Sequence, residues 1–291
     1  MPQIAIDDEV SLWYDEFPGH GMPILSSAAS FESGGYPEIL ARPPLARPVY
    51  QIQARGWGRS THLAADPVDG WLDTWADDVC RVADRLGIEK FIYTGVSHGG
   101  GIGWHLARRH PERLAALISV VGAPHDRAGG TASSAGRAAV IAGRTDAEVV
   151  RRQFEILAGH TDDPDRAAAR EHMYRRVAEN FAAQTEEEAR INQGKPFPEA
   201  VTDQQLADVL AGIRVPVLIL GALRDGVISP TASLRAAVSV PGSKTVLWED
   251  EGHMIAGESP ARLAREAALF LAELDGTAEP RDGVVSEAYR P

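Results

Sequence analysis

Three polar side chains of this sequence could act together as a nucleophile, a base and an orienting acid. The first is Ser97, in a Gly-x-Ser-x-Gly stretch at residues 95–99 that follows a run of β-forming residues and precedes a helical pattern. A sharp turn from strand to helix leaves the hydroxyl of such a serine exposed over the edge of the sheet. A serine hydroxyl is a poor nucleophile at neutral pH, so it needs a base that a carboxylate holds in place.

The candidates for that acid and that base follow Ser97 in the chain. Asp225 comes shortly after the apolar run at residues 215–220, and His253 shortly after the run at 245–248. Open α/β sheets bind their ligands at the carboxyl ends of the strands. We therefore expect Ser97 to attack a carbonyl carbon, His253 to accept its proton and Asp225 to orient His253. The backbone N–H of His98, at the start of the helix, would donate to the resulting oxyanion.

Strand and helix patterns alternate over most of the chain. Short runs of β-formers bounded by turn residues predict strands at residues 3–6, 10–14, 23–27, 49–53, 90–94, 114–121, 215–220 and 245–248. Helical patterns predict helices at residues 71–86, 103–110, 146–157, 165–184, 203–210 and 260–274. This alternation predicts an α/β fold with a mostly parallel central sheet and helices on both of its faces.

The strand pattern is interrupted between about residues 123 and 212. That stretch is rich in Ala, Arg and Glu, and we expect only helices in it. We therefore expect an α/β core made of residues 1–122 and 213–274, and a helical cap made of residues 123–212. Residues 275–291 mix Gly, Pro and charge with few apolar side chains, which predicts a mobile tail. The candidates to line a substrate pocket are Trp57, Phe154, Tyr174 and Phe181.

Composition excludes several classes of protein. The net charge is −12, because 29 basic residues face 41 acidic ones, so nucleic acids and anionic membranes are poor partners. The single cysteine, Cys80, cannot form an internal disulfide, and no apolar run is long enough to span a membrane. The first residues do not read as a signal peptide, so we expect a cytoplasmic protein. The His and Cys spacings match no metal motif, and no dinucleotide-binding loop is present, so we expect neither metal nor cofactor.

These motifs resemble those of the α/β-hydrolase superfamily, in its branch of cap-bearing esterases, lactonases and carbon–carbon-bond hydrolases. The resemblance covers residues 3–274 and includes an Arg-Gly-x-Gly-x-Ser loop at residues 55–60 and the turn at residues 109–113. It implies the roles already given to Ser97, Asp225 and His253, and it implies that the helical insertion covers the active site.

The chain departs from the family pattern at two places. The family usually has His-Gly after its third strand, where a backbone N–H completes the oxyanion hole, but this chain has Ala28-Ala29-Ser30. Counting along the loop predicts the backbone N–H of Ser30 as the donor. The second departure is Gln53, where the family often has Asp, and we assign it no catalytic consequence.

The leading interpretation is a serine hydrolase that cleaves a carboxylic ester or a lactone of a small acyl compound through an acyl-enzyme. One alternative is a carbon–carbon-bond hydrolase with the same three residues. Another is a binding protein of this fold, or a natural-product enzyme that uses the cavity for a non-hydrolytic step, because unrelated functions share one fold. The sequence leaves the substrate open, as well as the choice between a monomer and a homodimer.

Overall fold

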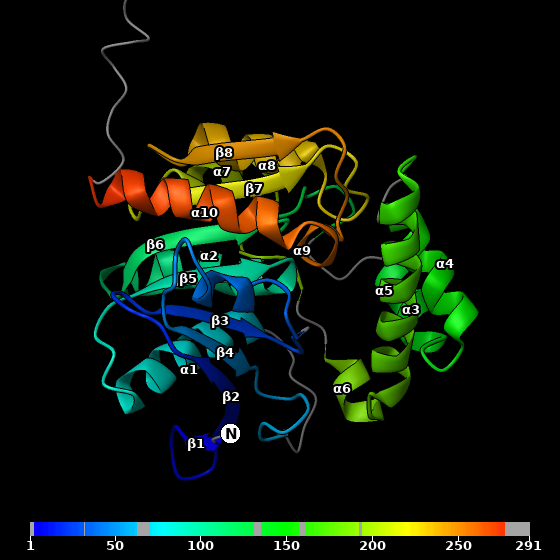
Figure 1. Cartoon of the computed structure of the whole chain (residues 1–291), viewed down its shortest axis with the longest axis horizontal. Coiled ribbons are helices and arrows are strands. Elements are labelled where there is room, and N and C mark those ends of the chain that lie inside the picture. The colour runs from blue at the N-terminus through cyan, green and yellow to red at the C-terminus, as the bar shows by residue number, and fades with distance from the viewer. Residues whose placement is uncertain are drawn as a thin grey trace, which may run out of the picture.

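The structure is a computed structural model of the whole chain, and it describes residues 3–31, 33–62, 70–130, 135–157, 161–191 and 194–276. Its centre is an eight-stranded sheet in the order β1-β2-β4-β3-β5-β6-β7-β8 (Figure 1). The first two strands are antiparallel to their neighbours and the remaining pairs are parallel. The strands are β1 (Gln3–Ala5), β2 (Ser11–Phe17), β3 (Ile24–Ala28), β4 (Val49–Gln53), β5 (Phe91–Val96), β6 (Leu114–Val120), β7 (Val217–Ala222) and β8 (Lys244–Trp248).

Helices cover both faces of the sheet, as the alternating pattern predicts. One apolar core lies under α1 (Trp71–Arg85), α2 (His98–Arg109), α7 (Asp203–Leu210) and α8 (Pro230–Ser239). The other core lies under η1 (Glu38–Ala41), α9 (Ile255–Glu258) and α10 (Pro260–Leu274). Because both faces are covered, the central strands are buried over nearly their whole length, and β7 is buried at every position.

The helix after the Ser97 turn begins five residues earlier than Gly103, the first residue of the predicted helix. It begins at His98, so the glycines at positions 99–101 are helical. Glycine weakens an isolated helix, but Gly99 and Gly100 pack against neighbouring backbone, and tertiary packing overrides the local preference. A Cβ on Gly100, for example, would lie 2.8 Å from the Cα of Gly122. The helical periodicity alone could not predict this first turn of α2.

Four helices between β6 and β7 lie beyond one end of the sheet (Figure 1). They are α4 (Ala147–Leu157) and α5 (Pro164–Ala183), which match predicted helices, and α3 (Ala135–Ala142) and α6 (Glu186–Arg190), which the sequence pattern did not predict. A small apolar cluster around Val140, Val150 and Ala178 joins three of them. In contrast, α7 packs on α8 over the sheet. The division of the chain into a core and a cap stays a prediction.

Two further expectations concern the ends of the chain and membranes. The predicted mobile tail lies outside the described residues, apart from Asp275 and Gly276. Within the described part of the chain, no helix has the length and apolar character needed to cross a bilayer.

Candidate active site

The turn between β5 and α2 presents Ser97 in a strained backbone conformation. Its φ is 51° and its ψ is −113°, a region that residues other than glycine seldom adopt. Small neighbours make the turn possible, because a Cβ on Gly95 would lie 2.1 Å from the carbonyl oxygen of Gly99. A Cβ on Gly99 would in turn lie 2.7 Å from the carbonyl oxygen of Ser27. The glycines around Ser97 therefore serve the close approach of backbone segments.

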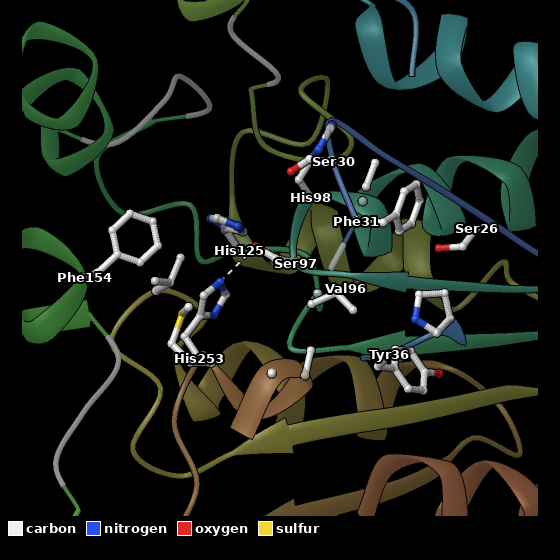
Figure 2. Close-up of a pocket in the computed structure, with 18 of the residues that line it drawn as sticks. Ser26, Ser30, Phe31, Tyr36, Val96, Ser97, His98, His125, Phe154 and His253 are labelled. Carbon is white, nitrogen blue, oxygen red and sulfur yellow. Dashed lines mark hydrogen bonds between the residues drawn. The ribbon is translucent and has the colours of Figure 1, made fainter. Parts of the chain in front are cut away.

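The structure brings together the three residues that the sequence singled out. His253 Nε2 lies 2.9 Å from Ser97 Oγ (Figure 2). His253 Nδ1 lies 2.9 Å and 3.0 Å from the two carboxylate oxygens of Asp225. A carboxylate accepts hydrogen bonds, so Nδ1 carries the ring proton and Nε2 is left to accept the proton of the serine. The geometry therefore suits removal of the Ser97 proton by His253.

Backbone groups hold Asp225 in place. Its Oδ1 accepts hydrogen bonds from the N–H groups of Val227 at 2.7 Å and Ile228 at 2.8 Å, and only 6% of the residue is exposed. These two hydrogen bonds and the burial hold the carboxylate of Asp225 in one position behind His253.

The segment that carries His253 is anchored by a buried carboxylate two residues earlier. Glu251 is fully buried, and its carbonyl oxygen accepts from the N–H of Arg224, next to Asp225. Its carboxylate pairs with Arg166 of α5 at 2.6 Å and with Arg262 of α10 at 2.8 Å. Burial raises the pKa of Glu251, whereas the hydroxyl of Ser259 and the two arginines oppose that shift. This network joins the helices beyond the sheet to the two segments that hold the acid and the base.

A cavity of about 450 Å³ opens above Ser97 and His253. Predicted pocket residues Phe154 and Phe181 lie on its wall, together with the apolar side chains of Phe31, Leu72, Val140, Met173, Val227 and Met254. Residues from the segments before and after the four helices contribute as well, among them His125, Gly194 and Pro196. The cavity is therefore a mainly apolar chamber with the reactive serine on its wall.

The other two predicted pocket residues do not line this cavity. Trp57 is buried, and the centroid of its ring lies 5.0 Å from that of Trp75 and 5.6 Å from that of His98. Tyr174 is buried as well, and its neighbour Met173 takes the place on the cavity wall. One residue along an α-helix turns a side chain by about 100°, so adjacent residues face different surroundings. Trp57 and Tyr174, which the sequence analysis expected to line the pocket, are therefore not on the wall of this cavity.

The loop after β3 reaches the cavity as expected. Ser30 and Phe31 line it, and Figure 2 shows Ser97 between His253 on one side and Ser30 on the other. The predicted oxyanion donors, the N–H groups of Ser30 and His98, thus belong to residues on the cavity wall. Their role as donors stays a prediction.

His125 is a cavity residue that the sequence analysis passed over. It follows β6, lines the cavity and lies close to Ser97 and His253 in Figure 2. Burial, reinforced by the positive charges of Lys195 and Arg127, lowers the pKa of His125 to about 4. The imidazole is therefore neutral at pH 7. Its place after a central strand was the only signal in the sequence that could have suggested a role.

No group of three or more His, Cys, Asp or Glu side chains that could hold a metal ion occurs among the residues that the structure describes. Cys80 is buried on α1, and burial raises the pKa of its thiol to about 12. Three histidines, His98, His125 and His253, line the cavity together with Ser97 and Lys195.

Comparison with known proteins places the chain among curated hydrolases. It is 28% identical over 278 residues to a protein of Azorhizobium caulinodans named as a carbamate hydrolase, RutD, with 90% of this chain and 96% of that protein covered. It is also 28% identical over 220 residues to a 2-hydroxymuconate semialdehyde hydrolase of Pseudomonas putida, with 72% and 73% covered.

Solved structures share the same fold. Est816, described as an enzyme that degrades N-acyl homoserine lactones, superposes with a TM-score of 0.70 at 21% identity, covering 92% of this chain and all of that one. The meta-cleavage product hydrolase of Pseudomonas fluorescens IP01 gives a TM-score of 0.71 at 21% identity, covering 91% and 95%. The sequence model of the α/β-hydrolase fold matches residues 20–260. The chain therefore belongs to the α/β-hydrolase family.

Proposed function

We propose that this protein is a serine hydrolase that cleaves a carboxylic ester or a lactone of a small, mainly apolar acyl compound. The observation that carries the proposal is the hydrogen-bonded chain from Ser97 through His253 to Asp225 at the wall of an apolar cavity. A strained serine, a base within 2.9 Å and a buried carboxylate behind it are the parts that acyl transfer needs.

The reaction proceeds in two halves. Ser97 Oγ bonds to the carbonyl carbon while its proton passes to His253 Nε2, and the electron pair of the C=O bond moves onto the oxygen. The oxyanion then collapses, the bond to the leaving oxygen breaks, and that oxygen takes the proton from His253. In the second half, water replaces Ser97 as the nucleophile and releases the acid, which regenerates the serine.

The cavity supports a preference within this class of substrate. Its lining is mainly apolar, but the neutral ring of His125 faces it, and none of the described residues makes a hydrogen bond to that ring. The nearby charges of Lys195 and Arg127 favour an electron-rich group at this place. We therefore infer that the substrate carries a carbonyl or hydroxyl oxygen that hydrogen-bonds His125, away from the bond that is cleaved.

A carbon–carbon-bond hydrolase remains the second candidate, because relatives and structural neighbours are named for that reaction. The same three residues would act on a carbonyl carbon, but the leaving group would be a carbanion that needs stabilisation by an adjacent carbonyl. A panel of substrates separates the two candidates: p-nitrophenyl esters of increasing acyl length, a γ-lactone with an acyl side chain, and a vinylogous 1,5-diketone.

The decisive experiment compares the wild-type protein with Ser97→Ala on that panel. We expect hydrolysis of an ester or lactone by the wild type and a loss of at least ~10³-fold in kcat in the variant, with an unchanged melting temperature. Hydrolysis of the diketone alone would favour the second candidate. Retention of more than about a hundredth of the wild-type kcat in Ser97→Ala would contradict the proposed nucleophile.

A further inference from the structure

The side chain of Gln53 holds the loop in which the family's His-Gly sequence is missing. Gln53 ends β4 and lies opposite Ala28, the last residue of the parallel strand β3. Its Nε2 donates a hydrogen bond of 3.1 Å to the carbonyl oxygen of Ala29, the residue before the expected oxyanion donor. The two departures from the family pattern, at residues 28–30 and at residue 53, are therefore in direct contact.

The orientation of the Gln53 amide follows from its second partner. The backbone N–H of Arg59 lies 2.7 Å from Gln53 Oε1, and a backbone N–H can only donate. The amide oxygen must therefore face Arg59, which leaves the NH₂ group to face Ala29. Gly58 makes room for this arrangement, since a Cβ there would lie 2.1 Å from Gln53 Nε2. The Arg-Gly-x-Gly-x-Ser loop thus closes around Gln53.

The geometry of a peptide bond carries this constraint to the cavity. The bond between Ala29 and Ser30 is trans, so its C=O and N–H point in opposite directions. Gln53 binds the carbonyl side and does not line the cavity, whereas Ser30 does. We propose that Gln53 is a positioning residue that turns the backbone N–H of Ser30 toward the oxyanion formed on Ser97.

This role requires a hydrogen-bond donor in the side chain at position 53. An ionised carboxylate only accepts hydrogen bonds, so an aspartate at position 53 could not hold the carbonyl oxygen of Ala29. Oxyanion stabilisation depends on donors that are oriented before the reaction, and displacement of a reacting group by about 1 Å can cost ~10²-fold in rate. The inference rests on the proposed function, because it assumes an oxyanion on the substrate of Ser97.

The test exchanges one atom of the side chain. Gln53→Glu keeps the shape and the acceptor for Arg59 but removes the donor to Ala29, so we expect kcat for the best ester to fall about 10- to 100-fold with KM within twofold. A boronic acid that adds to the serine places a hydroxyl where the oxyanion forms, and its inhibition constant should rise in parallel. Gln3→Glu is the matched control, because exposed Gln3 donates to the carbonyl of Arg59 at 3.3 Å in the same turn.

Two further variants complete the design. Ser30→Ala keeps the backbone N–H and should cost less than tenfold in kcat, whereas a larger loss would assign the oxyanion to the hydroxyl and overturn the proposal. Gln53→Met lacks both hydrogen-bonding groups without adding charge, and it decides the question if the melting temperature shows that Gln53→Glu is unfolded.

The outcomes separate this inference from the proposed function. Wild-type kcat in both Gln53 variants, or a rise in KM alone, would overturn the role of Gln53 while leaving the serine hydrolase intact. A wild-type protein that hydrolyses no ester or lactone and does not bind the boronic acid would instead contradict the proposed function.

Discussion

Acidification should destabilise this protein through His125. Its pKa is about 4 in the folded chain, mainly because the ring is buried, and secondarily because Lys195 and Arg127 repel a further positive charge; Asp126 opposes the shift. In the unfolded chain an unperturbed histidine has a pKa of about 6.5. Between about pH 4 and 6.5 the unfolded state therefore binds more protons than the folded state. The free energy of unfolding must fall as the pH falls through this window.

The size of the effect follows from the two pKa values. At pH 5 the unfolded histidine is almost fully protonated and the folded one is almost fully neutral. Linkage then gives a loss of about 2 kcal/mol relative to pH 8, where both are neutral. His125→Asn removes the titrating ring. Between pH 8 and pH 5, the free energy of unfolding of this variant should therefore fall by about 2 kcal/mol less than that of the wild type.

Urea unfolding at pH 8, 6 and 5 measures this difference directly. Comparison of the wild type with His125→Asn cancels the groups that titrate in both proteins. His172→Asn, which removes an exposed histidine of α5, is the matched control and should leave the pH dependence unchanged. Parallel loss of stability in the wild type and His125→Asn between pH 8 and pH 5 would refute the reasoning, because His125 would then be accessible to protons in the folded state.

Three further substitutions probe the site and its supports. Asp225→Asn should lower kcat by about 10⁴-fold with the fold intact by circular dichroism, since an amide favours the wrong histidine tautomer; near-normal turnover would contradict it. Arg166→Met removes a cation 2.6 Å from buried Glu251 and should lower the free energy of unfolding, measured in urea, by about 3 kcal/mol. The control Arg151→Met, which removes a surface cation, should lower it by at most about 1 kcal/mol. Gly95→Ala would place a Cβ 2.1 Å from a backbone carbonyl oxygen, so we expect the free energy of unfolding to fall by about 3 kcal/mol and ester hydrolysis to be lost. A melting temperature equal to that of the wild type would argue against this packing.

The sequence alone predicted the parts of this protein that depend on local patterns. The alternation of strands and helices indicated the sheet and the layers on it, and the structure confirms that fold class. The order Ser97, Asp225, His253, each after a strand, also predicted that the three residues meet, because parallel strands bring their carboxyl ends to one edge. The structure places His253 within hydrogen-bonding distance of both Ser97 and Asp225.

The tertiary structure decided which side chains face the cavity. Trp57 lies after a strand end as His125 does, yet Trp57 packs against Trp75 while His125 faces the chamber. On α5, Met173 faces the cavity and its neighbour Tyr174 does not. These choices depend on the rotation of each helix and on the partners available around it, and no local pattern in the chain encodes either.

The meaning of Gln53 was also decided in three dimensions. In the sequence it is a polar residue 24 positions after Ala29, with no visible link to the loop after β3. The parallel register of β3 and β4 places Gln53 opposite Ala28, and the turn at Arg59 then directs its amide to the carbonyl of Ala29. Strand register arises from the packing of the whole sheet, so the sequence by itself determines the nucleophile turn, and only the folded chain determines which groups support it.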